Sequence, residues 1–130
     1  TAWQSAVRPR HGCEHALAAR NDRKCTIALV MPTLDAVTHG GGRMQDAGHA
    51  IEWGPGRHGP GNNAFNYFID PFGIVIEYTA EVEQIDETHR PGQPSDWTWP
   101  PGRVDQWGIS APPSDRLKAA QRAVLFAPSL

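Results

Sequence analysis

A short turn between two apolar runs constrains the fold of this chain more than any other feature of its sequence. In the run AFNYFI, alternation places Phe65, Tyr67 and Ile69 on one face of a strand. The tetrapeptide DPFG at 70–73 has the composition of a type I turn, and IVIEYT at 74–79 follows it as a second β-rich run. Two strands joined by such a turn predict a β-hairpin.

The segment before the hairpin predicts a strand followed by a helix. CTIALVM, residues 25–31, is a short apolar run with β-branched side chains, and Pro32 ends it because proline cannot donate to a ladder. Thr33 can cap a helix that stops at Gly48. Three consecutive glycines at 40–42 are where this helix is expected to fray or break, since each costs about 0.5–1 kcal/mol relative to alanine.

The remaining elements complete the unit. HAIEW, residues 49–53, predicts another strand, and the glycine-rich residues 54–63 predict a long loop before the hairpin strands at 64–69 and 74–79. The order strand, helix, strand, strand, strand gives an α+β protein built on one βαβββ unit. One such sheet leaves a concave face open, which a second unit, a partner chain or the tail has to fill.

The chain divides into three parts. Residues 25–81 hold the βαβββ unit, and residues 1–24, which show no clear period, are expected to form an exposed N-terminal arm. Residues 82–130 form a tail rich in Pro and Trp that is expected to wrap the outside of the sheet. Ser114 can cap a final helix in this tail that reaches about Phe126.

Charge and length exclude several classes of function. The 130 residues suffice for one domain, and a net charge of −2 with a pI near 6.3 offers no basic surface for nucleic acid. No stretch approaches the ~20 consecutive apolar residues that cross a bilayer, so a cytoplasmic protein without a membrane partner is predicted. Cys13 and Cys25 are too few for a disulfide framework and are expected to be reduced thiols.

Three residues in and before the hairpin are candidates for chemistry. Glu77 lies on the strand face of Val75 and Thr79, where a buried carboxylate needs a partner or a metal; a solvent-facing side chain is the alternative. His58 lies in the loop GPGRHGPGNN, whose glycines let the backbone approach a ligand, or it is a surface histidine. Tyr67 is either a ligand contact or an ordinary half-buried aromatic residue.

The string GRHGPGNNAFNYFIDPFGIVIEYTAEVEQID is similar, in residue type, order and spacing, to the end of the catalytic domain of type I extradiol ring-cleaving dioxygenases. Similarity continues through TLDAV, DAGH, IEWGPGRH and RPGQPSDWTWPPGRVDQWG, so it extends over most of the chain from about residue 13. The chain thus resembles the C-terminal part of enzymes of the catechol 2,3-dioxygenase and 2,3-dihydroxybiphenyl dioxygenase type. These enzymes belong to the vicinal oxygen chelate superfamily, which is built from βαβββ modules.

The resemblance implies a role for each candidate. Glu77 matches the glutamate that binds a non-haem Fe(II), His58 the histidine that lines the substrate pocket, and Tyr67 the tyrosine that contacts bound catechol. His15, in the fragment CEH, matches roughly the place of the acid/base histidine. The implied cofactor is Fe(II), with Mn(II) as the alternative metal, or no metal at all.

The chain departs from the family at the iron ligands. A facial triad of two histidines and one carboxylate leaves one side of Fe(II) open for catechol and O2. The second ligand histidine of the family opens the first strand of the module, and Thr26 stands in its place in CTIALVMP. The first belongs to a preceding module, of which residues 1–24 keep only a remnant around CEHALAAR. One replacement site would join His15, His58 and Glu77. The other histidines are expected to be solvated surface residues: His11, His39, His49 and His89.

Three functional hypotheses follow. The first is O2-dependent meta-cleavage of a catechol or biaryl diol at a non-haem Fe(II), with slow or absent turnover because the triad is incomplete. The second is a metal-free module for aromatic-ligand binding or dimerisation, and the third is an inactive paralogue or fragment. A catechol-like small aromatic is the expected ligand, and the open sheet predicts a homodimer or another homo-oligomer.

Overall fold

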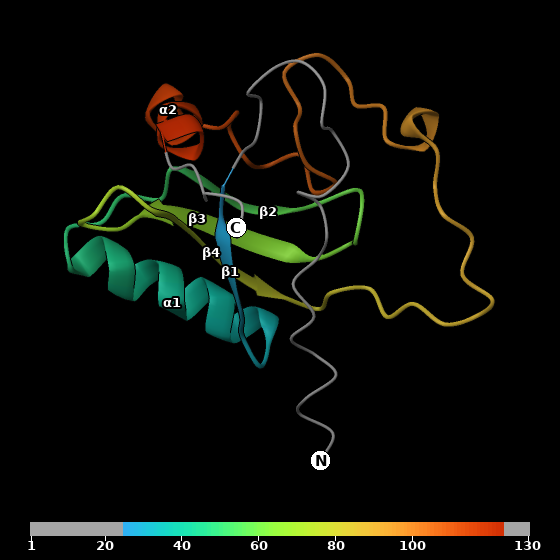
Figure 1. The fold of residues 1–130 in the computed structure, drawn as a ribbon, viewed down its shortest axis with the longest axis horizontal. Coiled ribbons are helices and arrows are strands. Elements are labelled where there is room, and N and C mark those ends of the chain that lie inside the picture. The colour runs from blue at the N-terminus through green and yellow to red at the C-terminus, as the bar shows by residue number, and fades with distance from the viewer. Residues whose placement is uncertain (1–24, 124–130) are drawn as a thin grey trace, which may run out of the picture.

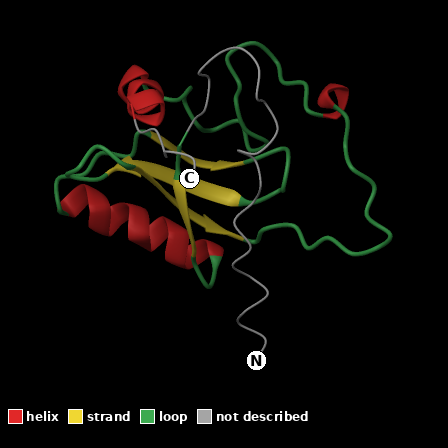
Figure 2. Ribbon diagram, viewed as in Figure 1, coloured by secondary structure: helices red, strands yellow, loops and turns green. Residues whose placement is uncertain are grey.

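A computed structural model of the chain describes residues 25–123, which form a four-stranded sheet between two helices (Figure 1). The elements are, in chain order, β1 (Ile27–Val30), α1 (Leu34–Asp46), β2 (Trp53–Arg57), β3 (Ala64–Ile69), β4 (Val75–Ala80), the short 3₁₀ helix η2 (Pro94–Asp96) and α2 (Asp115–Ala123). Figure 2 shows that the segment between β4 and α2 is loop apart from η2. No helix within these described residues is long and apolar enough to cross a membrane.

The sheet has the strand order β1-β4-β3-β2. β1 runs parallel to β4, which the crossover through α1 allows, while the β2–β3 and β3–β4 pairs are antiparallel. The predicted α+β class and the βαβββ order are therefore confirmed. β3 and β4 are joined by the predicted hairpin, in which Asp70 Oδ1 accepts hydrogen bonds from the amides of Phe72 and Ile74 at 2.8 Å each. Gly73 supplies a positive φ of 84° in the turn.

Helix α1 passes through its three glycines without a break, contrary to the expected weak point. Thr33 caps it as predicted, accepting from the amide of Ala36 at 3.0 Å. A Cβ on Gly40 would lie 2.9 Å from the Tyr78 ring, and one on Gly41 would lie 2.8 Å from Asn66 Nδ2. The glycines are needed because they let α1 lie directly against β3 and β4, and this packing offsets their low helix propensity.

The predicted strand at residues 49–53 is wrong, since β2 occupies Trp53–Arg57 inside the segment that was expected to be loop. Its glycines serve close approach between strands: a Cβ on Gly54 would lie 2.6 Å from Asn66 Oδ1, and one on Gly56 would meet the Phe65 ring. Pro55 is tolerated because β2 is an edge strand, where one side of the backbone needs no partner. The pairing of β2 with β3 shifts register between Trp53 and Gly56.

Helix α2 lies on the sheet face opposite α1 (Figure 1). It begins at Asp115 as predicted, and Ser114 Oγ accepts from the Leu117 amide at 2.9 Å. Leu117 is buried in an apolar cluster with Phe65, Tyr67, Ile69 and Val75. The tail thus does more than wrap the outside of the sheet, because α2 covers part of the face that was expected to be open. The predicted end of the helix near Phe126 lies outside the described residues.

Candidate active site

The structure brings His58, Tyr67 and Glu77 together on the face opposite α1. Tyr67 and Glu77 are direct partners in the β3–β4 ladder, so their side chains share a face. The Nε2 atom of His58 lies 3.1 Å from the Tyr67 hydroxyl oxygen and 3.5 Å from Glu77 Oε1. Glu77 is buried, which excludes the alternative of a solvent-facing carboxylate. Three residues that the sequence singled out separately therefore form one polar cluster.

A tight loop after β2 places the imidazole. The amide of His58 donates to the Asn63 carbonyl at 2.9 Å, and Asn62 takes a positive φ of 49° where the loop turns back. The tail supports this loop, because Gln106 Nε2 donates to the His58 carbonyl at 2.5 Å. The imidazole is thereby held over β3, where its ring stacks on Phe65 with centroids 4.1 Å apart.

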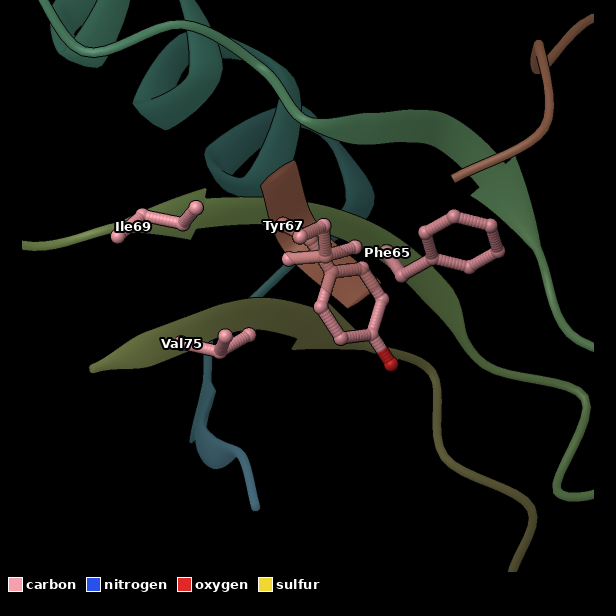
Figure 3. Packing of buried hydrophobic residues seen from close by; sticks show 5 residues of the cluster. Phe65, Tyr67, Ile69 and Val75 are labelled. Atoms are coloured by element: carbon pink, nitrogen blue, oxygen red, sulfur yellow. The ribbon is translucent and has the colours of Figure 1, made fainter. Parts of the chain in front are cut away.

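Aromatic rings surround the polar cluster. The Trp53 indole stacks on Tyr67 with ring centroids 5.1 Å apart, and lies 4.4 Å from the Phe65 centroid and 5.2 Å from the His58 centroid. Figure 3 shows the Tyr67 hydroxyl at the edge of the apolar cluster, directed away from Ile69 and Val75. Sequence reasoning missed Trp53, the first residue of β2, which pairs with Tyr67 in the ladder. Flat apolar walls around a few polar atoms are typical of sites for small aromatic ligands.

Burial and charge keep the Tyr67 phenol neutral. Burial raises the pKa of Tyr67 above its ordinary value, and the negative charge of Glu77 and a hydrogen bond to that carboxylate raise it further. A neutral phenol is a hydrogen-bond donor, so Tyr67 can offer its proton to the carboxylate or to a ligand oxygen in the same place.

Asn63 also supports Glu77, and sequence reasoning missed it. Its Nδ2 lies 3.3 Å from Glu77 Oε1 and 2.7 Å from Thr79 Oγ1. Adjacent asparagines after a glycine-rich stretch are common in turns, so no separate signal in the sequence indicated this contact. Thr79 follows Glu77 by two residues on the same strand face, which could have indicated that its hydroxyl belongs to the site.

The described residues do not by themselves fit a divalent metal. Residues 25–123 contain no group of three or more His, Cys, Asp and Glu side chains placed to hold an ion. Glu77 and His58 offer one carboxylate and one imidazole, fewer than the facial triad requires. Thr26 precedes β1, and its Oγ1 accepts a hydrogen bond from Gln121 Nε2 at 3.1 Å. His15 lies outside the described residues, so its predicted role stays a prediction.

The other histidines within residues 25–123 lie apart from this cluster. His39 is exposed on α1, 3.7 Å from Asp35, whereas His49 and His89 are only partly buried. His11 lies outside the described residues, as does Cys13.

Comparisons with known proteins agree with the fold. No family model matches the chain. Metapyrocatechase 2 of Cupriavidus necator is 34% identical over 85 residues, which cover 61% of this chain and 24% of the relative. The crystal structure of the Mn(II)-bound glyoxalase from Novosphingobium aromaticivorans matches with a TM-score of 0.57 and 38% identity, over 70% of this chain and 30% of that one.

The chain therefore spans less than a third of either relative. A metapyrocatechase is a catechol 2,3-dioxygenase, and the structural neighbour is a glyoxalase that binds Mn(II). The predicted resemblance is confirmed: the chain is extradiol dioxygenase-like, and its fold matches that of the vicinal oxygen chelate superfamily.

Proposed function

We propose that this chain provides the diol-binding part of an extradiol dioxygenase site and that its ligand is a catechol-like aromatic. The observation that carries the proposal is the contact of His58 Nε2 with both the Tyr67 hydroxyl and Glu77 Oε1, at 3.1 Å and 3.5 Å. Three hydrogen-bonding groups meet there beside aromatic walls. The similarity to a metapyrocatechase supports a ligand of this class.

The chemistry of the three groups suits two neighbouring hydroxyls. The neutral Tyr67 phenol donates one hydrogen bond, while the Glu77 carboxylate accepts from a ligand hydroxyl. The His58 imidazole can take or return a proton, since imidazole is the commonest general acid and base among side chains. The indole of Trp53, which is only partly buried, offers a flat surface on which a six-membered ring can stack.

Ring cleavage requires more than residues 25–123 contribute. Fe(II), or Mn(II) in its place, would supply the site at which O2 and diol react, and the family binds it through two histidines and a carboxylate. Glu77 is the ligand that this chain offers. We propose that the remaining ligands come from outside residues 25–123, and that the chain by itself binds diols but cleaves them slowly or not at all.

Binding of catechol and 2,3-dihydroxybiphenyl, followed by tryptophan fluorescence or calorimetry, tests the proposal. Saturable binding is expected in the parent, with weaker binding in Tyr67→Phe and in His58→Gln, because each variant loses a hydrogen bond to the diol. Glu77→Gln, which removes the charged acceptor, should also bind the diol more weakly, and Glu87→Gln in the exposed tail is its matched control. Absence of saturable diol binding in a folded parent would overturn the proposal.

A second arm of the experiment addresses turnover. The protein is loaded with Fe(II) anaerobically, mixed with the diol and exposed to air, while the yellow ring-fission product is followed. Little or no product is expected. Product formed at a rate typical of enzymes, roughly 1–1000 per second, would show that other groups complete the metal site.

A metal-free aromatic-binding module is the second candidate function. It is favoured by Asn63, whose amide already occupies Glu77 Oε1 within the described residues. Titration of catechol with and without Mn(II) separates the two candidates. Equal affinities support the metal-free module, and tighter binding with Mn(II) supports the dioxygenase-type site.

We also propose that the chain works as a homodimer or larger homo-oligomer. β1 is an edge strand whose apolar side chains are exposed: Ile27 by 40%, Leu29 by 47% and Val30 by 72%. Such an edge favours association. Sedimentation should show a dimer that Leu29→Lys weakens, whereas Phe72→Lys, at the exposed hairpin turn, should not. A stable parent monomer at micromolar concentration would contradict the proposal.

A further inference from the structure

The Glu77 carboxylate is supported by the side-chain amide of Asn63, which also binds the Thr79 hydroxyl. Asn63 Nδ2 donates to Glu77 Oε1 at 3.3 Å and to Thr79 Oγ1 at 2.7 Å. All three side chains are buried, with exposed fractions of 9% for Asn63, 8% for Glu77 and 3% for Thr79. Because water has little access to them, these hydrogen bonds cannot be replaced cheaply by solvent.

The direction of each hydrogen bond is fixed by the backbone of β3. Thr79 Oγ1 donates its single hydrogen to the Ala64 carbonyl at 2.8 Å, so towards Asn63 it can only accept. The Asn63 amide must therefore present its NH2 group, and not its oxygen, to Thr79. The same nitrogen then points its second hydrogen at Glu77. A chain of contacts thus runs from a strand carbonyl through a hydroxyl and an amide to the carboxylate.

We infer that Asn63 and Thr79 are positioning residues that hold the Glu77 carboxylate in place, facing His58, for the diol. The inference rests on the proposed function, because it assigns these residues to the same site. Neither residue is placed to touch the ligand; both act through Glu77. Without the amide, the carboxylate is free to rotate away from His58, and the ligand then has to order it at the cost of affinity.

Substitutions of matched shape test the inference with catechol as the probe. Thr79→Val keeps the volume of threonine but removes the acceptor for Asn63, and Thr79→Ser restores it. The dissociation constant of catechol should rise roughly three- to tenfold in Thr79→Val and in Asn63→Ala, the size expected for one lost hydrogen bond. It should return to within about twofold of the parent in Thr79→Ser.

A double-mutant cycle separates positioning from a merely structural role. If Asn63 acts through Glu77, Asn63→Ala should change catechol affinity little in a Glu77→Gln background, because the group that it orients has lost its charge. An unchanged loss of affinity in that background, with additive effects of the two substitutions, would overturn the inference.

The Glu77 side chain itself provides a readout that does not depend on the proposed function. In crystal structures, or by NMR of ¹³C-labelled glutamate, Glu77 should occupy one rotamer in the parent and in Thr79→Ser. It should be displaced or multiply populated in Thr79→Val. A parent that does not bind catechol but shows this pattern refutes the diol function and keeps the positioning role. An unmoved Glu77 in folded Thr79→Val refutes the positioning role whatever the ligand data show.

Discussion

His58 Nε2 lies 3.1 Å from the Tyr67 hydroxyl because Arg57 pairs with Ala64 and Gly56 with Phe65 in the β2–β3 ladder. That pairing folds the loop after β2 back over β3, so that the His58 imidazole lies beside Tyr67 of β3. The contact therefore depends on the close approach that the β2 glycines allow. Glycine in this segment does not indicate a flexible loop. It allows the close strand approach that positions a functional side chain.

The first prediction concerns alkaline pH. Burial and the nearby Glu77 raise the pKa of Tyr67, so the folded state favours the protonated phenol. The sign follows from linkage: this contribution to stability is present below the ordinary tyrosine pKa, about pH 10, and is lost as pH rises above it. The tyrosinate absorbance of the native parent minus that of Tyr67→Phe should stay near zero to about pH 11 and appear on unfolding. A native-state signal from Tyr67 near pH 10 would contradict this burial.

The second prediction uses two neighbouring glycines of α1. Gly42→Ala should stabilise the protein by about 0.5–1 kcal/mol, because nothing lies within 4 Å of the added Cβ and alanine is the better helix former. Gly41→Ala should destabilise it by about 1–3 kcal/mol, because the Cβ would lie 2.8 Å from Asn66 Nδ2. Urea unfolding of both variants gives the two signs. Equal effects would mean that α1 does not lie against β3 as described.

The hairpin and the shared face of Tyr67 and Glu77 could be predicted from the sequence because strand alternation is local. The period of two fixes the face of each side chain once the turn at 70–73 is recognised. β2 could not be predicted, because its glycines and proline carry a turn signal and the reason for them, contact with Asn66 and Phe65, is tertiary.

The position of α2 likewise could not be predicted from the sequence. Its start was predicted from Ser114, whose capping role is local, but the face that it covers is decided by Leu117 packing among residues of β3 and β4. Asn63 was missed for a similar reason: its contact with Glu77 joins residues fourteen positions apart.

The third prediction tests how the tail supports the loop of His58. Asp105 is buried and accepts hydrogen bonds from the amides of Trp107, Ser110 and Arg57, at 3.1, 3.2 and 3.4 Å. Asp105→Ala leaves these amides without their acceptor and should lower the free energy of unfolding by about 2–4 kcal/mol. Asp46→Ala, exposed at the end of α1, is the control and should change it by less than about 0.5 kcal/mol. A loss from Asp105→Ala as small as that of the control would show that the tail is not anchored there.

The last prediction concerns Thr26, which stands where the resemblance places a ligand histidine. Thr26 lies two residues before Ala28, the β1 partner of Glu77, and offers only a neutral hydroxyl. Thr26→His replaces that hydroxyl with an imidazole, so the affinity for Fe(II) or Mn(II) should rise by about tenfold or more, even if turnover stays absent. Thr38→His, on the exposed side of α1, adds the same imidazole elsewhere and should give no gain. The gain should also vanish when Glu77→Gln is added, because the two side chains would share one ion. Calorimetric metal titration of the parent and the three variants measures these affinities. A gain in metal affinity that survives Glu77→Gln would mean that the ion binds elsewhere. Tight metal binding by the parent would show that Thr26 is not the missing ligand.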